Sequence, residues 1–220
     1  MALDAHAKRA KKGVEVKNKN YDLVYADPPW QVIKTIRKVR PKQIRNLDYP
    51  TLPLGEIKEI MEDYDSDILF IWTTDKFLFK SENLGKELGY TLHTRIIWNK
   101  ENGMCPAFTI RFAHEYLLWF YKKGKLMPIA KEATGKFTSV ITEKPIRHSA
   151  KPLKAYELIE TLYPNHSKIE LFARNKRDGW DSWGNEDNQE NQGGTKNMNK
   201  EKEAMQVGKQ ASFAREGGEG

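Results

Sequence analysis

A short apolar run that ends in two consecutive prolines most constrains the fold of this chain. Residues 22–26 predict a buried β-strand, because Leu23-Val24-Tyr25-Ala26 is an apolar run. Pro28 and Pro29 follow almost at once. Proline has no N–H and a locked φ, so a strand cannot continue through this pair. The sequence therefore predicts a strand that ends at Ala26 and passes into a rigid turn from Asp27 to Trp30.

Strand and helix patterns alternate along the rest of the chain. The predicted strands are 22–26, 67–72, 94–98, 115–121 and 168–173. The predicted helices are 53–63, 75–88 and 152–162, the last with Pro152 suited to a first turn and Pro164 just beyond its end. Strands that alternate with helices indicate an α/β fold with a mainly parallel sheet.

One domain with two unfolded ends is the predicted organisation. Residues 1–18 are expected to form a disordered basic arm, and residues 19–186 the folded domain. From 187 to 220 the chain is rich in Asn, Gln, Gly, Lys and Glu, so we expect a disordered polar tail. An apolar fraction of 39% and six Trp are enough for a core in the middle segment.

Composition excludes several classes of protein. A single cysteine, Cys105, rules out a disulfide framework within one chain and a zinc site built from cysteines. His6, His93 and His166 lack the spacing of metal ligands, so no metal is expected. No apolar run approaches the roughly 18 residues that span a bilayer. We expect a protein of the reducing cytoplasm, without a membrane segment.

Basic residues gather directly after the proline turn. Lys and Arg exceed Asp and Glu by 37 − 30 = 7 over the 220 residues. Between residues 31 and 47 the chain has no acidic residue but six basic ones, Lys34, Arg37, Lys38, Arg40, Lys42 and Arg45. Such a run is either a solvated loop or a contact for phosphates, and its place beside the turn favours nucleic acid.

The Asp-Pro-Pro-Trp turn also suits a particular chemistry. An exocyclic base amine is a poor nucleophile, because its lone pair is delocalised into the ring. A carboxylate and a rigidly held backbone carbonyl can accept its two N–H bonds, and Trp30 offers a face on which a base can stack. The alternative is an ordinary turn at a strand end with a surface Asp.

Further segments in the same order resemble one family. They are Asn46 to Leu52, Leu69 to Thr74, Ile96 to Lys100, Arg111 to Glu115, His148 to Pro152, and Ile169 to Arg174 followed by Gly179 to Glu186. With the Asp-Pro-Pro-Trp turn, they make residues 21–186 similar to the adenine N(6)-methyltransferases related to the catalytic subunit of the messenger-RNA adenosine methyltransferase. The resemblance implies a Rossmann-like methyltransferase fold that uses S-adenosyl-L-methionine, with a permuted order in which the catalytic loop precedes the cofactor-binding strand.

The resemblance also implies residue roles. Asp27 would bind the amine and contact the cofactor, Pro28 would supply the carbonyl, Pro29 would hold it, and Trp30 and Tyr49 would border the flipped base unless they are core aromatics. Residues around the ribose and adenine of the cofactor would be Glu170, Arg174, Lys176, Arg177, Asn185 and Glu186. Lys176 and Arg177 depart from the His-Asn found at this place in the messenger-RNA enzyme. His114 is either near the methionine carboxylate of the cofactor or structural, His148 either touches the pocket or begins a helix, and Lys151-Pro152 is interpreted as a helix start.

Three functions remain open from the sequence. The leading one is methyl transfer to the N(6) amine of adenine in DNA, as in phage and bacterial members of the family. The second is the same reaction on RNA, and the third is a non-catalytic nucleic-acid-binding subunit. A homodimer or a heterodimer could supply additional substrate-binding surface, and the target site is not encoded in any motif of the chain.

Overall fold

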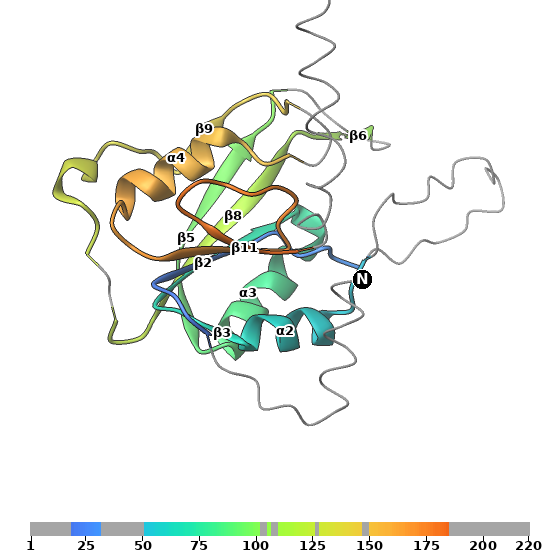
Figure 1. Cartoon of the computed structure of the whole chain (residues 1–220). Helices are drawn as coiled ribbons and strands as arrows, with labels where there is room; N and C mark the ends of the chain where they lie inside the picture. Colours follow the sequence, from blue (N-terminus) through green and yellow to red (C-terminus); the bar gives the residue numbers. More distant parts are fainter. Residues whose placement is uncertain are drawn as a thin grey trace, which may run out of the picture.

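A seven-stranded sheet lies at the centre of the molecule (Figure 1). The computed structural model describes residues 19–31, 51–101, 105–106, 110–125, 128–146 and 150–184. In spatial order the sheet contains β11 (Asp181–Trp183), β10 (Lys168–Leu171), β2 (Leu23–Ala26), β4 (Ile68–Thr73), β8 (His114–Lys122), β5 (Tyr90–Asn99) and β9 (Val140–Thr142). The other elements are β1 (Lys19–Asn20), α2 (Leu54–Glu62), β3 (Tyr64–Asp65), η2 (Asp75–Phe77), α3 (Leu78–Glu87), β6 (Cys105–Pro106), β7 (Arg111–Phe112), η3 (Lys131–Ala133) and α4 (Leu153–Leu162).

Strand direction decides which ends of the strands share an edge. β11, β10, β2 and β4 are parallel neighbours, whereas β8 is antiparallel to both β4 and β5. β8 therefore begins at the edge where β2, β4 and β10 end. The prediction of an α/β fold with a mainly parallel sheet is confirmed.

Alternation along the central strands produces two apolar layers. Leu23 and Tyr25 of β2 pack into one cluster with α4, and Val24 and Ala26 pack into the other with α2 and α3. Because successive side chains of a strand point to opposite faces, a strand that is apolar throughout can be covered on both sides. Figure 1 shows α4 on one side of the sheet and α2 and α3 on the other, a three-layer arrangement.

The predicted strands and helices all correspond to observed elements, with differences at their ends. The segment 75–88 begins as the single turn η2 before it becomes α3, and the strand expected at 94–98 is the end of the longer β5. The sequence analysis missed the short strands β1, β3, β6, β7, β9 and β11. Strands of two or three residues are too short to show a periodic pattern.

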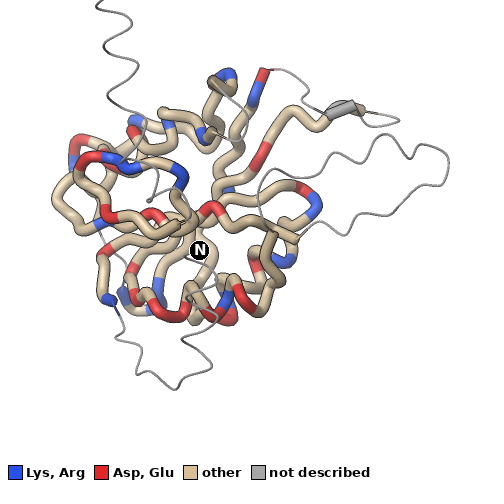
Figure 2. The backbone as a smooth tube through the Cα atoms, turned by 45° about the vertical axis from the view of Figure 1, so that its right-hand side comes forward, with Lys and Arg blue, Asp and Glu red and all other residues tan. Residues whose placement is uncertain are grey.

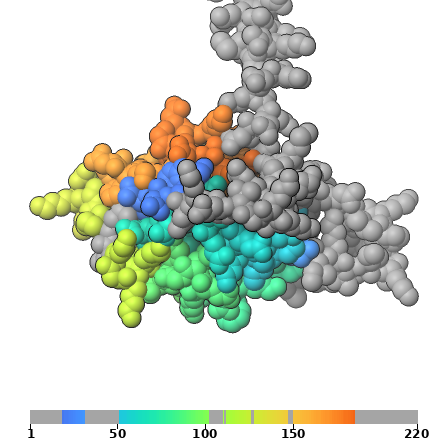
Figure 3. All heavy atoms as spheres, turned by 60° about the horizontal axis from the view of Figure 1, so that its bottom comes forward, coloured from blue at the N-terminus to red at the C-terminus, as the bar shows by residue number. Residues whose placement is uncertain are grey.

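The two ends of the described chain meet in the sheet. β10 pairs with β2, and Figure 3 shows these regions as adjoining orange and blue surfaces. Figure 2 shows that acidic and basic residues are interspersed along the described chain. No helix within the described segments is long and apolar enough to cross a membrane. The expected disordered ends, residues 1–18 and 187–220, lie outside the described residues.

Candidate active site

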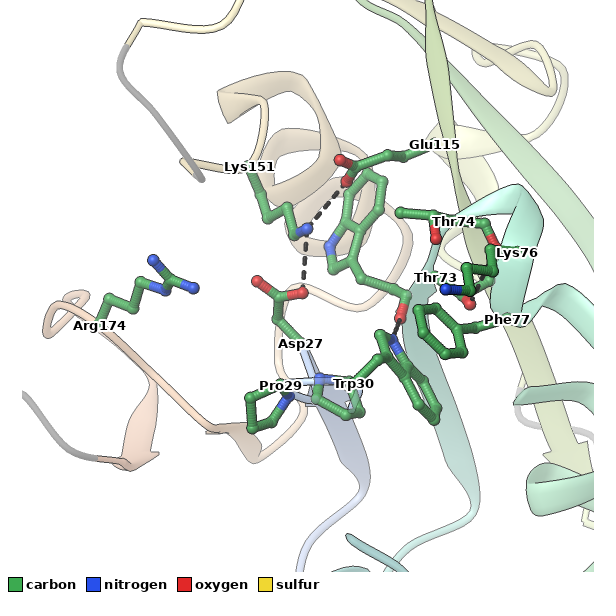
Figure 4. A pocket seen from close by; sticks show the side chains of 12 residues that line it. Asp27, Pro29, Trp30, Thr73, Thr74, Lys76, Phe77, Glu115, Lys151 and Arg174 are labelled. Carbon is green, nitrogen blue, oxygen red and sulfur yellow. Dashed lines mark hydrogen bonds and ion pairs between the residues drawn. The ribbon is translucent and has the colours of Figure 1, made fainter. Parts of the chain in front are cut away.

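A pocket of about 260 Å³ opens at the edge of the sheet where the parallel strands end (Figure 4). Its lining residues come from five separate segments and are Asp27, Pro28, Pro29, Trp30, Trp72, Thr73, Thr74, Lys76, Phe77, Glu115, Lys151 and Arg174. In open α/β sheets, ligands bind outside the carboxyl ends of the strands. The position of the pocket therefore agrees with a ligand site.

Backbone hydrogen bonds hold the Asp27–Trp30 turn in place. The Asp27 N–H donates to the Leu171 carbonyl of β10 at 3.3 Å, and the Pro29 carbonyl accepts from the Leu52 N–H at 2.9 Å. Within the turn, the Trp30 N–H donates to the Pro28 carbonyl at 2.9 Å, the three-residue pattern of a γ-turn. A carbonyl oxygen has two lone pairs, so the Pro28 carbonyl retains one for another donor.

The Trp30 side chain is fixed against a second aromatic ring. Its indole N–H donates to the Trp72 carbonyl at 3.1 Å, and its ring stacks on Phe77 with centroids 5.8 Å apart and planes 16° apart. Phe77 belongs to η2, just after β4. The two rings form a rigid apolar wall of the pocket (Figure 4).

Two carboxylates that line the pocket share one ammonium group. Lys151 Nζ lies 2.9 Å from Asp27 Oδ1 and 2.9 Å from Glu115 Oε2, and Figure 4 shows it between them. Glu115 also pairs with Lys100. The side chains of Lys151, Asp27 and Glu115 are only 13%, 17% and 15% exposed, so water screens this network weakly.

Burial and neighbouring charges move the pKa values of the network in different directions. Burial raises the pKa of Asp27 above its ordinary value, although Lys151 acts against this shift. Burial also disfavours the charge on Glu115, but Lys151 and Lys100 together hold its pKa below the ordinary value. For Lys151, burial is outweighed by Asp27 and Glu115, which raise its pKa. At neutral pH the lysine is a cation.

The local structure around Lys151 explains its position. The backbone N–H groups of Leu153 and Lys154 donate to the Glu143 carboxylate at 2.8 and 3.0 Å, which caps the start of α4 just after Lys151. The ammonium lies 5.0 Å from the Trp72 ring centroid, a cation–π distance. Lys151-Pro152 was predicted to shape the helix start. Pro152 does precede α4. Lys151, by contrast, points into the pocket.

Arg174, like Asp27, is a predicted cofactor residue that lines the pocket. It follows β10 on a tight turn in which Phe172 has φ +62°, a left-handed conformation that favours glycine. The turn is fixed to the neighbouring strand, because the Ala173 N–H donates to the Trp183 carbonyl at 3.0 Å. Figure 4 shows Arg174 on one side of Asp27, and Thr73, Thr74, Lys76 and Phe77 on the other.

Other predicted cofactor residues lie beside the pocket and do not line it. Glu170 is buried under α4, where it accepts from the Tyr156 hydroxyl at 3.1 and 3.2 Å. Burial raises its pKa to about 7. Arg177 forms a bidentate pair with Glu160 at 2.6 and 3.0 Å and lies over the Tyr156 ring.

His114 and Lys176 also lie outside the pocket lining. The His114 ring nitrogen Nε2 shares a hydrogen bond with the Tyr116 hydroxyl at 3.0 Å, and Lys176 is exposed. The contact with Tyr116 agrees with the structural alternative for His114.

Several predicted residues fall outside the described part of the chain. They are Tyr49 of the base pocket, the six basic residues Lys34, Arg37, Lys38, Arg40, Lys42 and Arg45, the cofactor residues Asn185 and Glu186, and His148. Their roles stay predictions. Among the described residues, no group of His, Cys, Asp and Glu is arranged to hold a metal ion.

The sequence analysis missed part of the pocket. Glu115 was predicted as the start of a strand and the end of a family-like segment, and Thr73 and Thr74 only as part of another such segment. Lys76 and Phe77 were predicted as the start of a helix, and none of these residues was assigned to the pocket that they line. A signal was present, since Glu115 and Lys76 are charged residues at the ends of apolar strands. Which strand ends meet at one edge depends on strand direction, which local patterns do not encode.

Comparison with known proteins assigns the chain to a family. Residues 21–186 match the MT-A70 family model. The type II methyltransferase M.MunI of Mycoplasma sp is 32% identical over 209 residues, which cover 82% of this chain and 88% of the relative. The putative N(6)-adenosine-methyltransferase MT-A70-like protein of Medicago truncatula is 25% identical to this chain. The N(6)-adenosine-methyltransferase MT-A70-like protein of Arabidopsis thaliana is 27% identical.

The plant relatives are much longer proteins. Their matches cover 74% and 73% of this chain but only 26% and 23% of the relatives themselves, so the chain spans about a quarter of their length. The M.MunI match, by contrast, extends over most of both chains. The family match covers the whole sheet and every residue that lines the pocket. The chain therefore belongs to the MT-A70 family of methyltransferases, as its motifs predicted.

Proposed function

We propose that this protein transfers a methyl group from S-adenosyl-L-methionine to the exocyclic N(6) amine of adenine in DNA. One observation carries the proposal: Asp27 and Pro28 line the same pocket as the stacked Trp30 and Phe77 rings. Two acceptors next to an aromatic wall complement a planar base that carries an amine. DNA is preferred because the relative named a type II methyltransferase matches over 88% of its own length.

Asp27 and Pro28 act on the amine by position and charge. Each accepts one N–H of the amine, which draws its lone pair out of conjugation with the ring. Asp27 Oδ1 already bonds Lys151, and a carboxylate with about four acceptor sites keeps others for the amine. The amine becomes acidic only as it gains the methyl group, so a strong base is not required. The carbon–sulfur bond of the sulfonium would break as the carbon–nitrogen bond forms, the thioether would leave, and the released proton would pass to the Asp27 carboxylate or to water. Orientation contributes most of the rate.

The charges of the pocket fit S-adenosyl-L-methionine. This cofactor supplies an electrophilic methyl group, and its amino-acid end carries one ammonium and one carboxylate. The pocket offers the opposite set, with Asp27 for the ammonium and Lys151 and Arg174 for the carboxylate. Glu115 keeps Lys151 in place and charged, since it pairs with the same ammonium from the other side.

The order of strands supports a permuted methyltransferase fold as part of this proposal. In chain order, β2 is the first strand of the seven-stranded sheet, and the Asp27–Trp30 turn follows it. Arg174 follows β10, which comes near the end of the described chain. β10 nevertheless pairs directly with β2, so the two ends of the chain meet at one site. In this reading the cofactor strand was moved behind the catalytic strand in sequence but kept its place in the sheet.

Transfer of labelled methyl groups to matched duplex DNA, single-stranded DNA and RNA tests the proposal. We expect label in N(6)-methyladenine of DNA with the wild-type protein and at least a hundredfold less with Asp27→Asn, which removes the charge and keeps the shape. Asp75→Asn is the matched control, because Asp75 is exposed and absent from the pocket lining. Its activity should equal that of the wild type.

Two outcomes would change the assignment. Label in RNA alone would assign the protein to the N(6)-adenosine class of its plant relatives. An absence of label in all three substrates, together with cofactor binding measured by calorimetry, would identify the chain as a non-catalytic subunit.

A further inference from the structure

Lys76 is a cation at the rim of the pocket that the proposed chemistry does not use. It lies on η2, three residues after the end of β4, and its ammonium is 5.6 Å from the Phe77 ring centroid. Within the described segments it forms no ion pair, whereas Lys58, Lys100 and Lys151 each pair with a carboxylate. Its charge is therefore available to a ligand.

The carboxylates of the pocket do not neutralise Lys76. Asp27 and Glu115 line the same pocket, but both bond the Lys151 ammonium. Asp75, next to Lys76 in the chain, is exposed and does not line the pocket. An incoming anion would consequently meet Lys76 without displacing an internal partner.

Lys76 stands on the acceptor side of the pocket. Arg174 is on one side of Asp27, and Lys76 is on the other with Phe77 and Thr74 (Figure 4). Group transfer in one step requires donor and acceptor on opposite sides of the moving group. Since the proposed function assigns Arg174 and Lys151 to the donor, the base enters along the wall that carries Lys76.

A base in a strand brings its backbone with it. When a nucleotide is turned out of the stack, the base enters the pocket and the sugar and flanking phosphates remain at the rim. Trp30 and Phe77 are the apolar wall for the base, and Lys76 adjoins that wall with a flexible four-carbon stem. Lysine is well suited to contact a phosphate as a point charge.

From this arrangement we infer that Lys76 binds a backbone phosphate flanking the target adenine. This inference rests on the proposed function. It assigns a phosphate contact to Lys76, a residue that no sequence motif indicated. The contact gives affinity and position without reading sequence.

Binding to a single-stranded oligonucleotide that the wild type methylates, measured by fluorescence anisotropy over a range of salt, tests the inference. Lys76→Met should reduce the slope of log affinity against log salt by about 0.7, the value of one phosphate contact on a single strand. Lys76→Arg should restore the slope. Lys80→Met is the matched control, because Lys80 is an exposed lysine of α3 that does not line the pocket.

A neutral methylphosphonate placed at each linkage in turn locates the contact. One linkage beside the target adenine should weaken binding of the wild type and have no further effect on Lys76→Met, because the variant has already lost that contact. Calorimetry with S-adenosyl-L-methionine should give the same affinity for the wild type and Lys76→Met.

Failure of this inference is distinct from failure of the proposed function. A wild type that methylates DNA, with a salt slope that Lys76→Met leaves unchanged, would overturn the inference alone. Lys80→Met lowering the slope as much as Lys76→Met would also overturn it, since the effect would then be general surface charge. A wild type that neither binds nor methylates a nucleic acid would overturn both.

Discussion

At the scale of single residues, the site depends on charged side chains that are largely shielded from water. Lys151 bridges Asp27 and Glu115, and Lys100 adds a second cation to Glu115. Removing one partner of a buried ion pair leaves the other charge uncompensated, which costs more than the pair contributes. The four charges therefore act as a unit, and a substitution in one of them changes the others.

Glu170 is the residue whose ionisation should affect stability most clearly. Burial raises its pKa from an ordinary value of 4.5 to about 7, so the folded protein binds a proton more tightly than the unfolded chain between those values. Stability then falls as pH rises through this window. We expect Glu170→Gln to be more stable than the wild type at pH 8, by up to about 3 kcal/mol, and equal to it near pH 4. Urea unfolding at both pH values measures this.

Glu160→Gln provides a control of opposite sign. Its hydrogen bond with Arg177 lowers the pKa of Glu160, so this carboxylate stabilises the fold above its unfolded pKa, and the contribution is lost as pH falls. Glu160→Gln should be less stable than the wild type at pH 8. If Glu170→Gln is also less stable at pH 8, the Tyr156 hydrogen bond outweighs the cost of burying the charge.

At the scale of elements, the turn after β10 and the end of β11 are packed without free space. A Cβ on Gly184 would lie 2.1 Å from the Ala173 carbonyl oxygen, and this backbone leads directly into Arg174. We expect Gly184→Ala to cost about 1–3 kcal/mol of unfolding free energy and to weaken binding of S-adenosyl-L-methionine. Denaturation and calorimetry on the same sample test the two effects.

Gly55→Ala is the control at this scale. No atom lies within 4 Å of a Cβ at Gly55, which belongs to α2, and alanine is the better helix former. This variant should be more stable than the wild type by roughly 0.5–1 kcal/mol and bind the cofactor unchanged. If Gly184→Ala and the wild type bind S-adenosyl-L-methionine with equal affinity, the turn after β10 does not contribute to cofactor binding.

At the scale of the whole molecule, cofactor binding should stabilise the entire sheet. The pocket draws on β2, β4, β8, β10 and the start of α4, so a ligand there contacts both ends of the described chain. A ligand at one hundred times its Kd adds about 2.7 kcal/mol to unfolding. A thermal shift with S-adenosyl-L-methionine should therefore be clear in the wild type and much smaller in Lys151→Met. Equal thermal shifts in both proteins would show that Lys151 does not contribute to cofactor binding.

Local sequence patterns predicted the main elements because these depend on near neighbours. The run Leu23–Ala26 is apolar on both faces of the sheet, and the apolar spacing of α4 matches one buried helix face. The same locality explains the omissions, since β9 and β11 are three residues each and become strands only through pairing with β5 and β10.

The sequence by itself determined the α/β class, the rigid turn at Asp27–Trp30 and the family to which the chain belongs. Only the tertiary structure decided that Lys151 and Glu115 meet Asp27, that Lys76 stands on the side of Trp30, and that Glu170 lies under α4. The reason is physical. A strand or a turn is specified by interactions a few residues long, whereas the pocket is assembled from segments far apart in the chain, and their meeting depends on the order and direction of strands in the sheet.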